Sequence, residues 1–180
     1  FMDGTHFAHH PRTAELQARR DGWIGPTTLV DSSCAFNLQD RSNIRYNTEL
    51  EPMGAIGDAG WYNMRAAVEC LPPGLMLKSV HAVLRRDEET GAAMGGTGEL
   101  LFEGGVRSTW NCGFDAQPSS MHVHIEGASG EIEMPGFLFQ ERDNSARLVV
   151  RQGDAEPTTR RIASDKPGSV LMFEDMAAAA

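Results

Sequence analysis

The stretch VRSTWNCGFD, residues 106–115, alternates between two sets of side chains. One set is mostly small or apolar and the other is mostly polar: Val106, Ser108, Trp110, Cys112 and Phe114 against Arg107, Thr109, Asn111 and Asp115. Successive side chains of a β-strand point to opposite faces of its sheet. The alternation therefore predicts a strand with one packed face and one face that is wet or lies at an interface.

Similar patterns flank this stretch on both sides. Residues 76–86 and 98–103 have strand-like lengths, and the sequence EGG at 103–105 is typical of a hairpin turn between strands. Met121, Val123 and Ile125 continue the alternation, and further strands are predicted over residues 27–36, 148–150 and 158–162. These segments together predict a mostly antiparallel sheet that begins as a meander.

Helical patterns lie mainly before the meander. Residues 11–20 begin with Pro11 and end on basic residues before Gly22, which is typical of a short helix. Residues 56–71 carry apolar side chains near helical spacing and stop at a Pro-Pro-Gly sequence. The strong helix formers at residues 171–176, followed by four alanines, predict a third helix, with a disordered tail as the alternative. The polar stretch 37–52 predicts a long loop over a binding cleft. The fold class predicted is α+β, an open, mostly antiparallel sheet with helices on one face.

Composition narrows the possible classes of protein. A chain of 180 residues with 41% hydrophobic content is large enough for one domain with its own core. A formal charge of -9 disfavours nucleic acid and anionic membrane surfaces, because both attract clustered Lys and Arg. The three cysteines are odd in number and far apart, which disfavours a disulfide framework and fits a reducing compartment. We therefore expect a cytoplasmic protein without nucleic-acid or membrane partners.

Two motifs carry weak signals of a bound group. The sequence GGTG at 95–98 opens a predicted strand, whereas a dinucleotide-binding loop opens a helix. We therefore expect these residues to be a flexible approach to the strand, that is, a flexible segment that leads into it, and not a phosphate site. His122 and His124 lie on one side of a strand, and Glu126 continues that side. Two histidines and a carboxylate can bind a metal, but the same spacing places polar residues on the wet face of a strand, and we favour this second interpretation.

A more specific cluster precedes the predicted helix at residues 11–20. His9, His10 and Arg12 lie where the predicted first segment gives way to that helix, a position where binding groups often gather. Histidine titrates near neutral pH, and the guanidinium donates several hydrogen bonds to oxygen atoms. These residues are candidates for substrate binding, with capping of the junction as the alternative.

The strongest candidate site is the segment GDAGWYNMR, residues 57–65. Asp58 and Tyr62 are four residues apart and share one face of a helix, so both can reach one substrate molecule. Tyr62 can exchange a proton with a carbonyl or hydroxyl group, whereas Asp58 can alternatively be an N-cap. A tyrosine needs a cationic neighbour to act as a base at neutral pH, and the sequence near Tyr62 does not show one.

These motifs together resemble a known family. MDGTHFAHHPRT at residues 2–13, followed by GDAGWY at 57–62, resembles the glucose-fructose oxidoreductase/inositol dehydrogenase (Gfo/Idh/MocA) family, nearest to its dihydrodiol and sugar dehydrogenases. The stretches 98–102 and 127–130 are similar to strands of that family's sheet. The resemblance extends over nearly the whole chain.

The resemblance implies a two-domain parent enzyme. Its N-terminal Rossmann domain binds NAD or NADP and carries a Glu-Lys-Pro motif with a catalytic lysine, and this sequence contains neither. Residues 1–7 would form a strand from the end of the Rossmann sheet. Residues 1–22 would be the remnant of that domain with a junction helix, and residues 23–180 the C-terminal domain for substrate binding and oligomerisation.

The resemblance also implies roles for the candidate residues. Tyr62 matches the position used for proton transfer or substrate contact, and Asp58 would orient the substrate or the start of the helix. The substrate would be a sugar or a dihydrodiol-like compound, and the sheet would form a homodimer or larger homo-oligomer. The chain alone is expected to be inactive and to bind NAD or NADP weakly. The alternative is a binding or dimerisation domain without catalysis.

Overall fold

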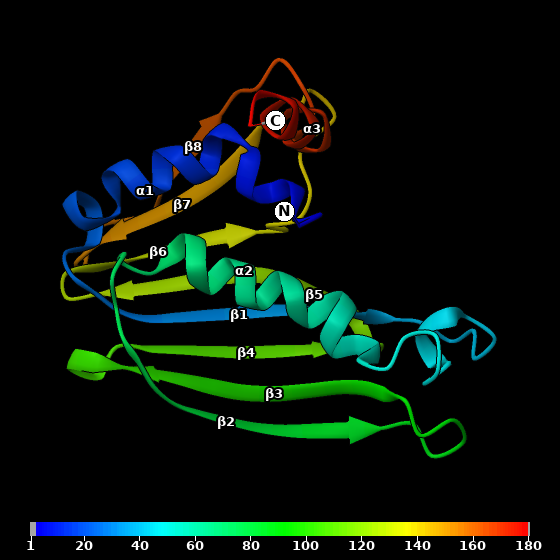
Figure 1. Ribbon diagram of the computed structural model, residues 1–180. Helices are drawn as coiled ribbons and strands as arrows, with labels where there is room; N and C mark the ends of the chain where they lie inside the picture. Colours follow the sequence, from blue (N-terminus) through cyan, green and yellow to red (C-terminus); the bar gives the residue numbers. More distant parts are fainter. Residues whose placement is uncertain (1–2, 180) are drawn as a thin grey trace.

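The computed structural model describes residues 3–179 and contains one eight-stranded open sheet (Figure 1). The strand order is β2-β3-β4-β1-β5-β6-β7-β8, and neighbouring strands are antiparallel except β1 and β4, which are parallel. The strands are β1 (Thr27–Asn37), β2 (Leu77–Arg86), β3 (Ala93–Phe102), β4 (Arg107–Gly113), β5 (Asp115–Gly127), β6 (Gly130–Pro135), β7 (Ala146–Gln152) and β8 (Thr158–Ile162). The predicted α+β class and mostly antiparallel sheet are confirmed.

Two long helices cover one face of the sheet (Figure 1). The α1 helix (Pro11–Ile24) packs on β6 and β7, and α2 (Trp61–Cys70) packs on β1 and β4. The core lies between these helices and the sheet and includes Leu16, Val30 and Leu148, each fully buried. Within residues 3–179, the opposite face of the sheet carries no helix, as predicted.

The alternation in residues 106–115 has its predicted effect. Ser108, Trp110 and Cys112 of β4 are buried on the helix side, whereas Arg107 on the other side is exposed. The hairpin between β3 and β4 contains η4 (Glu103–Gly105), in which Gly104 and Gly105 have φ of 74° and 80°. A positive φ is accessible to glycine at little cost, which explains why this turn has two of them.

The helix at residues 11–20 extends four residues beyond its predicted end. Gly22 does not stop α1 because Trp23 and Ile24 after it are buried, and their packing offsets the weak helix propensity of glycine. The helix stops at Gly25, whose φ is 72°. The segment 56–71 is also helical, but its first part is a π-helix (Ile56–Gly60) that runs into α2.

The glycine cluster 95–98 lies inside β3, and the prediction of a flexible approach to the strand is wrong. A Cβ atom at Gly98 would lie 2.5 Å from Cζ2 of Trp110 and 2.5 Å from the carbonyl oxygen of His81. Glycine is therefore required here by close packing, and the strand forms despite the low β-propensity of glycine.

The strand β6 was not predicted, and β5 begins six residues before the alternation at Met121.

The strand predicted over residues 1–7 is not found in its described part. The backbone N–H of Thr5 donates to Oδ1 of Asp3 at 3.1 Å, and the chain then turns into the 3₁₀ helix η1 (His6–His9). Such local hydrogen bonds compete with strand formation. Residues 1 and 2 of the predicted strand lie outside the described residues.

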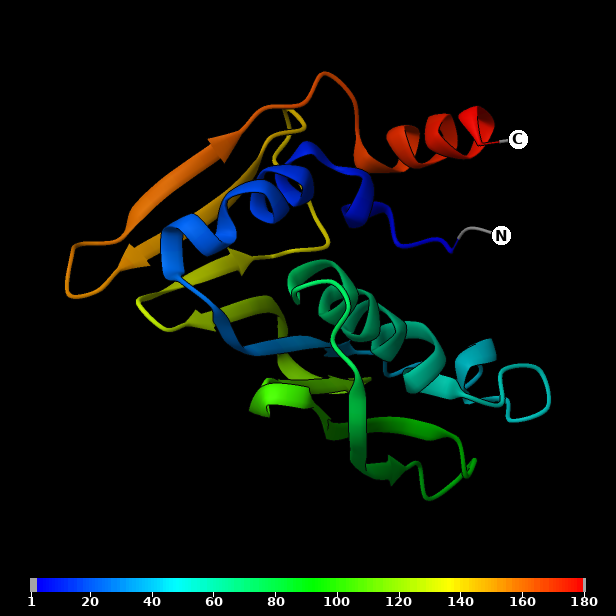
Figure 2. The same ribbon diagram turned by 60° about the vertical axis from the view of Figure 1, so that its left-hand side comes forward.

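The predicted C-terminal helix is present as α3 (Gly168–Ala178), which lies beside η1 (Figure 2). Gly168 allows a close approach, since a Cβ atom there would lie 2.8 Å from the carbonyl oxygen of His6. The η1 segment and the start of α3 are thus held together. No helix within residues 3–179 has the length and apolar character needed to cross a membrane.

We predict that Val30→Ala lowers the free energy of unfolding by about 2 kcal/mol, because Val30 is fully buried in the central strand β1. The matched control Val83→Ala removes the same methyl groups from edge strand β2, where the residue is 70% exposed, and should change stability by less than about 0.5 kcal/mol. Urea denaturation measures both values. Equal losses in the two variants would contradict the placement of the core.

Candidate functional site

Asp58 lies in the π-helical turn that leads into α2, opposite the long loop at residues 38–52. The loop contains the short 3₁₀ helix η2 (Ile44–Tyr46), which presents Arg45 to this turn. Arg45 donates from Nε to Oδ2 of Asp58 at 2.7 Å and from Nη2 to Oδ1 at 2.9 Å. This bidentate pair fixes the carboxylate and fastens the loop to the helix. Asp58 is not the N-cap of α2, since that position is Gly60.

Tyr62 is half-buried against the segment that precedes α1. Its ring lies 6.2 Å from the ring of His6 in an edge arrangement and 6.4 Å from the ring of Phe7. Burial raises the pKa of Tyr62 above its ordinary value, and the nearby acidic groups, Asp58 foremost with Cys34 and Asp3, raise it further. The phenol is therefore protonated at neutral pH and is suited to donate a proton or a hydrogen bond.

Charged groups near Tyr62 are paired with one another. Arg65 donates to Asp3 at 3.1 Å and also pairs with Glu69, one turn along α2. The pKa of His6 is lowered by burial and by the nearby His9, so its imidazole is neutral at neutral pH. These pairings leave Tyr62 among carboxylates and a neutral imidazole.

His10 and Arg12 are both buried and have structural partners. Nδ1 of His10 accepts from the backbone N–H of Arg12 at 3.0 Å, which makes His10 the N-cap of α1, and Nε2 lies 2.8 Å from the carbonyl oxygen of Asn144. The ring thus carries its proton on Nε2. Arg12 donates to the carbonyl of Phe137, and burial lowers its pKa to about 10, so it remains charged at neutral pH.

His9 points to the C-terminal helix. Its Nδ1 lies 2.7 Å from Oδ2 of Asp175 in α3, and the side chain is 12% exposed. Its Nε2 is buried and has no hydrogen-bond partner among residues 3–179. Of the five residues singled out from the sequence, the structure places Asp58 and Tyr62 near each other at the opening of α2, whereas His9 lies in η1, and His10 and Arg12 follow it at the start of α1.

Three nearby residues were not singled out from the sequence. Arg45 completes the pair with Asp58, His6 borders Tyr62, and Asn63 is fully buried and donates to Oγ of Ser32 at 2.9 Å. Arg45 lies in an irregular loop, where no periodic pattern indicates which side chain turns inward. Because residues 1–7 were expected to form a strand, nothing singled out His6. The apolar spacing of the helix gave no reason to single out Asn63, which is polar.

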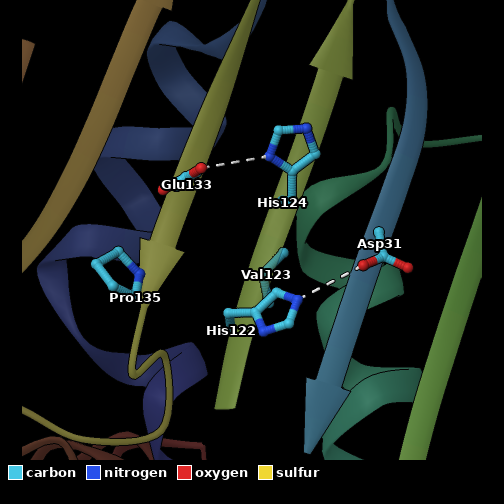
Figure 3. A pocket seen from close by; sticks show the side chains of 6 residues that line it. All are labelled: Asp31, His122, Val123, His124, Glu133 and Pro135. Carbon is cyan, nitrogen blue, oxygen red and sulfur yellow. Dashed lines mark ion pairs between the residues drawn. The ribbon is translucent and has the colours of Figure 1, made fainter. Parts of the chain in front are cut away.

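A second cluster lies on the open face of the sheet (Figure 3). A hollow of about 320 Å³ is lined by Asp31, His122, Val123, His124, Glu133 and Pro135. Nε2 of His122 lies 3.6 Å from Oδ2 of Asp31, and Nε2 of His124 lies 3.6 Å from Oε1 of Glu126. Within the described part of the chain, no group of three or more His, Cys, Asp or Glu side chains is arranged to hold a metal ion. The arrangement is that of a polar sheet face with ion pairs.

Comparison with known proteins gives matches over most of the chain. The model of the GFO/IDH/MocA C-terminal domain matches residues 16–133. Two curated relatives are dTDP-3,4-didehydro-2,6-dideoxy-alpha-D-glucose 3-reductases. The enzyme of Streptomyces antibioticus is 26% identical over 83% of this chain and 44% of its own length. The enzyme of Actinomadura kijaniata is 28% identical over 74% of this chain and 39% of its own length. The chain thus spans less than half the length of these relatives.

Solved structures share the fold. A 3-ketoreductase from Actinomadura kijaniata, in complex with NADP and TDP-benzene, has a TM-score of 0.84 at 21% identity, over 99% of this chain and 54% of that one. An aldose-aldose oxidoreductase from Caulobacter crescentus, complexed with glycerol, has a TM-score of 0.79 at 20% identity, over 98% of this chain and 53% of that one. Both likenesses extend over the whole sheet and its helices.

We predict that Asp58→Asn lowers the pKa of Tyr62, because it removes a negative charge that opposes ionisation and releases Arg45 from its pair. Spectrophotometric titration of tyrosinate in a Tyr46→Phe background isolates Tyr62, since the chain has two tyrosines. The control Asp40→Asn changes an exposed carboxylate that pairs with Ser42 and should leave the titration of Tyr62 unchanged. An unchanged or higher pKa in Asp58→Asn would contradict this site.

Proposed function

The chain belongs to the GFO/IDH/MocA family, and from this premise we propose that it is the substrate-binding part of an NAD(P)-dependent oxidoreductase. The proposed reaction moves a hydride between the cofactor and a sugar or related hydroxyl or carbonyl compound. The observation that carries the proposal is the placement of Tyr62 and Asp58 together at the opening of α2. The relatives that are sugar reductases support the substrate class.

Tyr62 has the proton that a carbonyl substrate requires. When a carbonyl is reduced, negative charge develops on its oxygen, and a positioned phenol can donate a proton to it. The raised pKa keeps Tyr62 protonated for this role. In the reverse direction Tyr62 must accept a proton, which needs a cationic neighbour to lower its pKa. We propose that the lysine of the nucleotide-binding part of the whole protein supplies this charge.

Asp58 and His9 are proposed to contact the substrate. The oxygens of Asp58 are fixed by Arg45 and can still accept hydrogen bonds from sugar hydroxyl groups, since a carboxylate has about four acceptor positions. Nε2 of His9 is free of partners among the described residues. His10 and Arg12 were also candidates for substrate binding. Since both are buried, we propose that they hold η1 and α1 in position and do not touch the substrate.

The glycine cluster at residues 95–98 does not form a loop that cradles a dinucleotide. The glycine cluster 95–98 lies within β3, where a Cβ atom at Gly96 would lie 2.9 Å from a methyl group of Leu84. Strand glycines that are packed in this way do not present backbone N–H groups to a pyrophosphate. We therefore assign NAD or NADP to a part of the whole protein other than residues 23–180, with residues 1–22 at the junction, and we derive no hydride step from this chain.

A second proposed function is that of a binding or dimerisation domain without catalysis. The open face of the sheet is rich in small and polar residues such as Ser33, Thr97 and Asn111, so a second sheet can approach it closely. We propose that this face forms a homodimer, which would cover a surface that no helix protects. The buried, free state of all three cysteines supports a reducing, cytoplasmic location.

For the oxidoreductase proposal, we predict that the whole protein transfers hydride between NAD(P) and a sugar substrate and that Tyr62→Phe lowers kcat/KM by about 10²- to 10⁴-fold. The matched control Tyr46→Phe should cost less than tenfold, because Tyr46 donates to the carbonyl of Leu38 within the loop. Steady-state assays with each cofactor measure the effect. Hydride transfer by the isolated 180 residues that Tyr62→Phe abolishes would contradict the assignment of the cofactor site to another part.

For the homodimer, we predict that light scattering gives twice the monomer mass and that Asn111→Arg gives the monomer mass, because a long charged side chain at the centre of the open face prevents close approach. The control Ala18→Arg places the same side chain at an exposed position of α1 and should leave the dimer intact. A monomer at high concentration of the unmodified chain would rule out this interface.

A further inference from the structure

Two cysteines lie side by side beneath the turn that carries Asp58. Cys34 of β1 and Cys112 of β4 are direct partners in the parallel register of these strands. Both side chains point to the helix face, and they are 1% and 0% exposed. A Cβ atom at Gly60 would lie 3.3 Å from Sγ of Cys112, so the turn rests directly on this sulfur. The proposed reaction uses neither thiol.

The spacing of the strands favours an ion between the sulfurs over a direct bond. Neighbouring strands lie about 4.8 Å apart, and in-register side chains on one face begin at about that separation. A disulfide requires Cβ atoms about 3.8 Å apart on average, so it would need the two strands to approach each other. Both strands are held on their other sides by β3 and β5, which opposes this movement. An ion bound to both sulfurs needs no such approach.

The surroundings restrict the kind of ion. No third His, Cys, Asp or Glu joins the two sulfurs in a metal-binding arrangement within residues 3–179, and Zn²⁺ in proteins takes four ligands. Thiolates select soft ions, some of which accept two ligands. A divalent ion with two thiolates is neutral, whereas a monovalent ion would leave a net negative charge in the core, which is costly. We infer that Cys34 and Cys112 form a two-thiolate site for a soft divalent ion of the Hg²⁺ class.

The binding reaction is a proton exchange. Burial raises the pKa of Cys34 to about 12, with further effects from Asp58 and Cys112, and burial raises the pKa of Cys112 to about 11. Both thiols are thus protonated at neutral pH. Two S–H bonds break, two Hg–S bonds form from the sulfur electron pairs, and two protons pass to solvent together with the two chlorides of the HgCl₂ supplied, with no change in oxidation state. Entry requires local opening of the turn at residues 56–60, which covers the sulfurs.

Cys70 provides a matched control. It is also fully buried, and burial raises its pKa to about 12, but it lies at the end of α2, where Arg20 donates to its carbonyl oxygen at 2.8 Å. It has the same chemistry and burial as Cys34 without a second thiol as its strand partner. If the ion prefers the pair to Cys70, the preference is therefore due to the placement of two thiols side by side and not to the burial of a single thiol.

The test is a titration of the chain with HgCl₂, followed by native mass spectrometry and by proton release in weakly buffered solution. We expect one tightly bound Hg²⁺ per chain and two protons released, both retained in Cys70→Ser. Cys34→Ser and Cys112→Ser should each weaken binding by more than the roughly 100-fold that loss of an outer-shell partner costs a metal site.

Several results would overturn the inference. These are one proton released per ion with independent binding at each cysteine, loss of the tight site in Cys70→Ser, or ready closure of a Cys34–Cys112 disulfide by dilute hydrogen peroxide in the folded chain. Far-UV circular dichroism establishes whether the serine variants fold. If they do not fold, the stoichiometry and proton release of the unmodified chain decide the question.

Discussion

The pairing of β1 with strands on both of its sides is the constraint on which the rest of the structure depends. β1 is parallel to β4 and antiparallel to β5, so it joins the hairpin half of the sheet to the half made by β5 to β8. Its helix-facing side chains, such as Val30 and Cys34, form the floor on which α2 rests. Removal of this strand would leave α2, and the site at its opening, without support.

The site follows from how α2 begins on that floor. Gly60 lets the turn lie directly on Cys112, and Asn63 fixes the first turn of α2 to Ser32 of β1 by a buried hydrogen bond. Asp58 then faces the loop, where Arg45 holds it with two hydrogen bonds. Tyr62 faces η1 and remains protonated because of burial and neighbouring carboxylates. A preorganised substrate site requires polar groups that rigid elements hold in place. Here the sheet supports α2, and Asp58 and Tyr62 are the polar groups at its opening.

Sequence patterns predicted those parts of the fold in which burial has a clear period. The alternation around Trp110 predicted its strand correctly, because one face of that strand is packed and the other is not. The helix after residue 56 was also predicted correctly, but Trp61 and Val68 of the apolar pattern are 44% and 70% exposed, and the buried face of α2 is formed by Asn63, Ala66, Ala67 and Cys70. The strand at residues 93–98 was hidden by its glycines, of which Gly98 is needed for contact with Trp110, a tertiary requirement that no local pattern shows. The nearness of Asp58 to Tyr62 was accessible from their spacing of four residues, whereas Arg45 reaches Asp58 from an irregular loop, and only the folded chain brings it there.

The most direct test of the account is to map where a sugar binds to this chain. Titration of the ¹⁵N-labelled protein with D-glucose, monitored by amide chemical shifts, distinguishes the two faces of the sheet. The account predicts that shifts change in η1, in the turn at residues 56–60 and in the first turn of α2, around Tyr62. Changes confined to the open face around His122 and His124, with none near Tyr62, would contradict it.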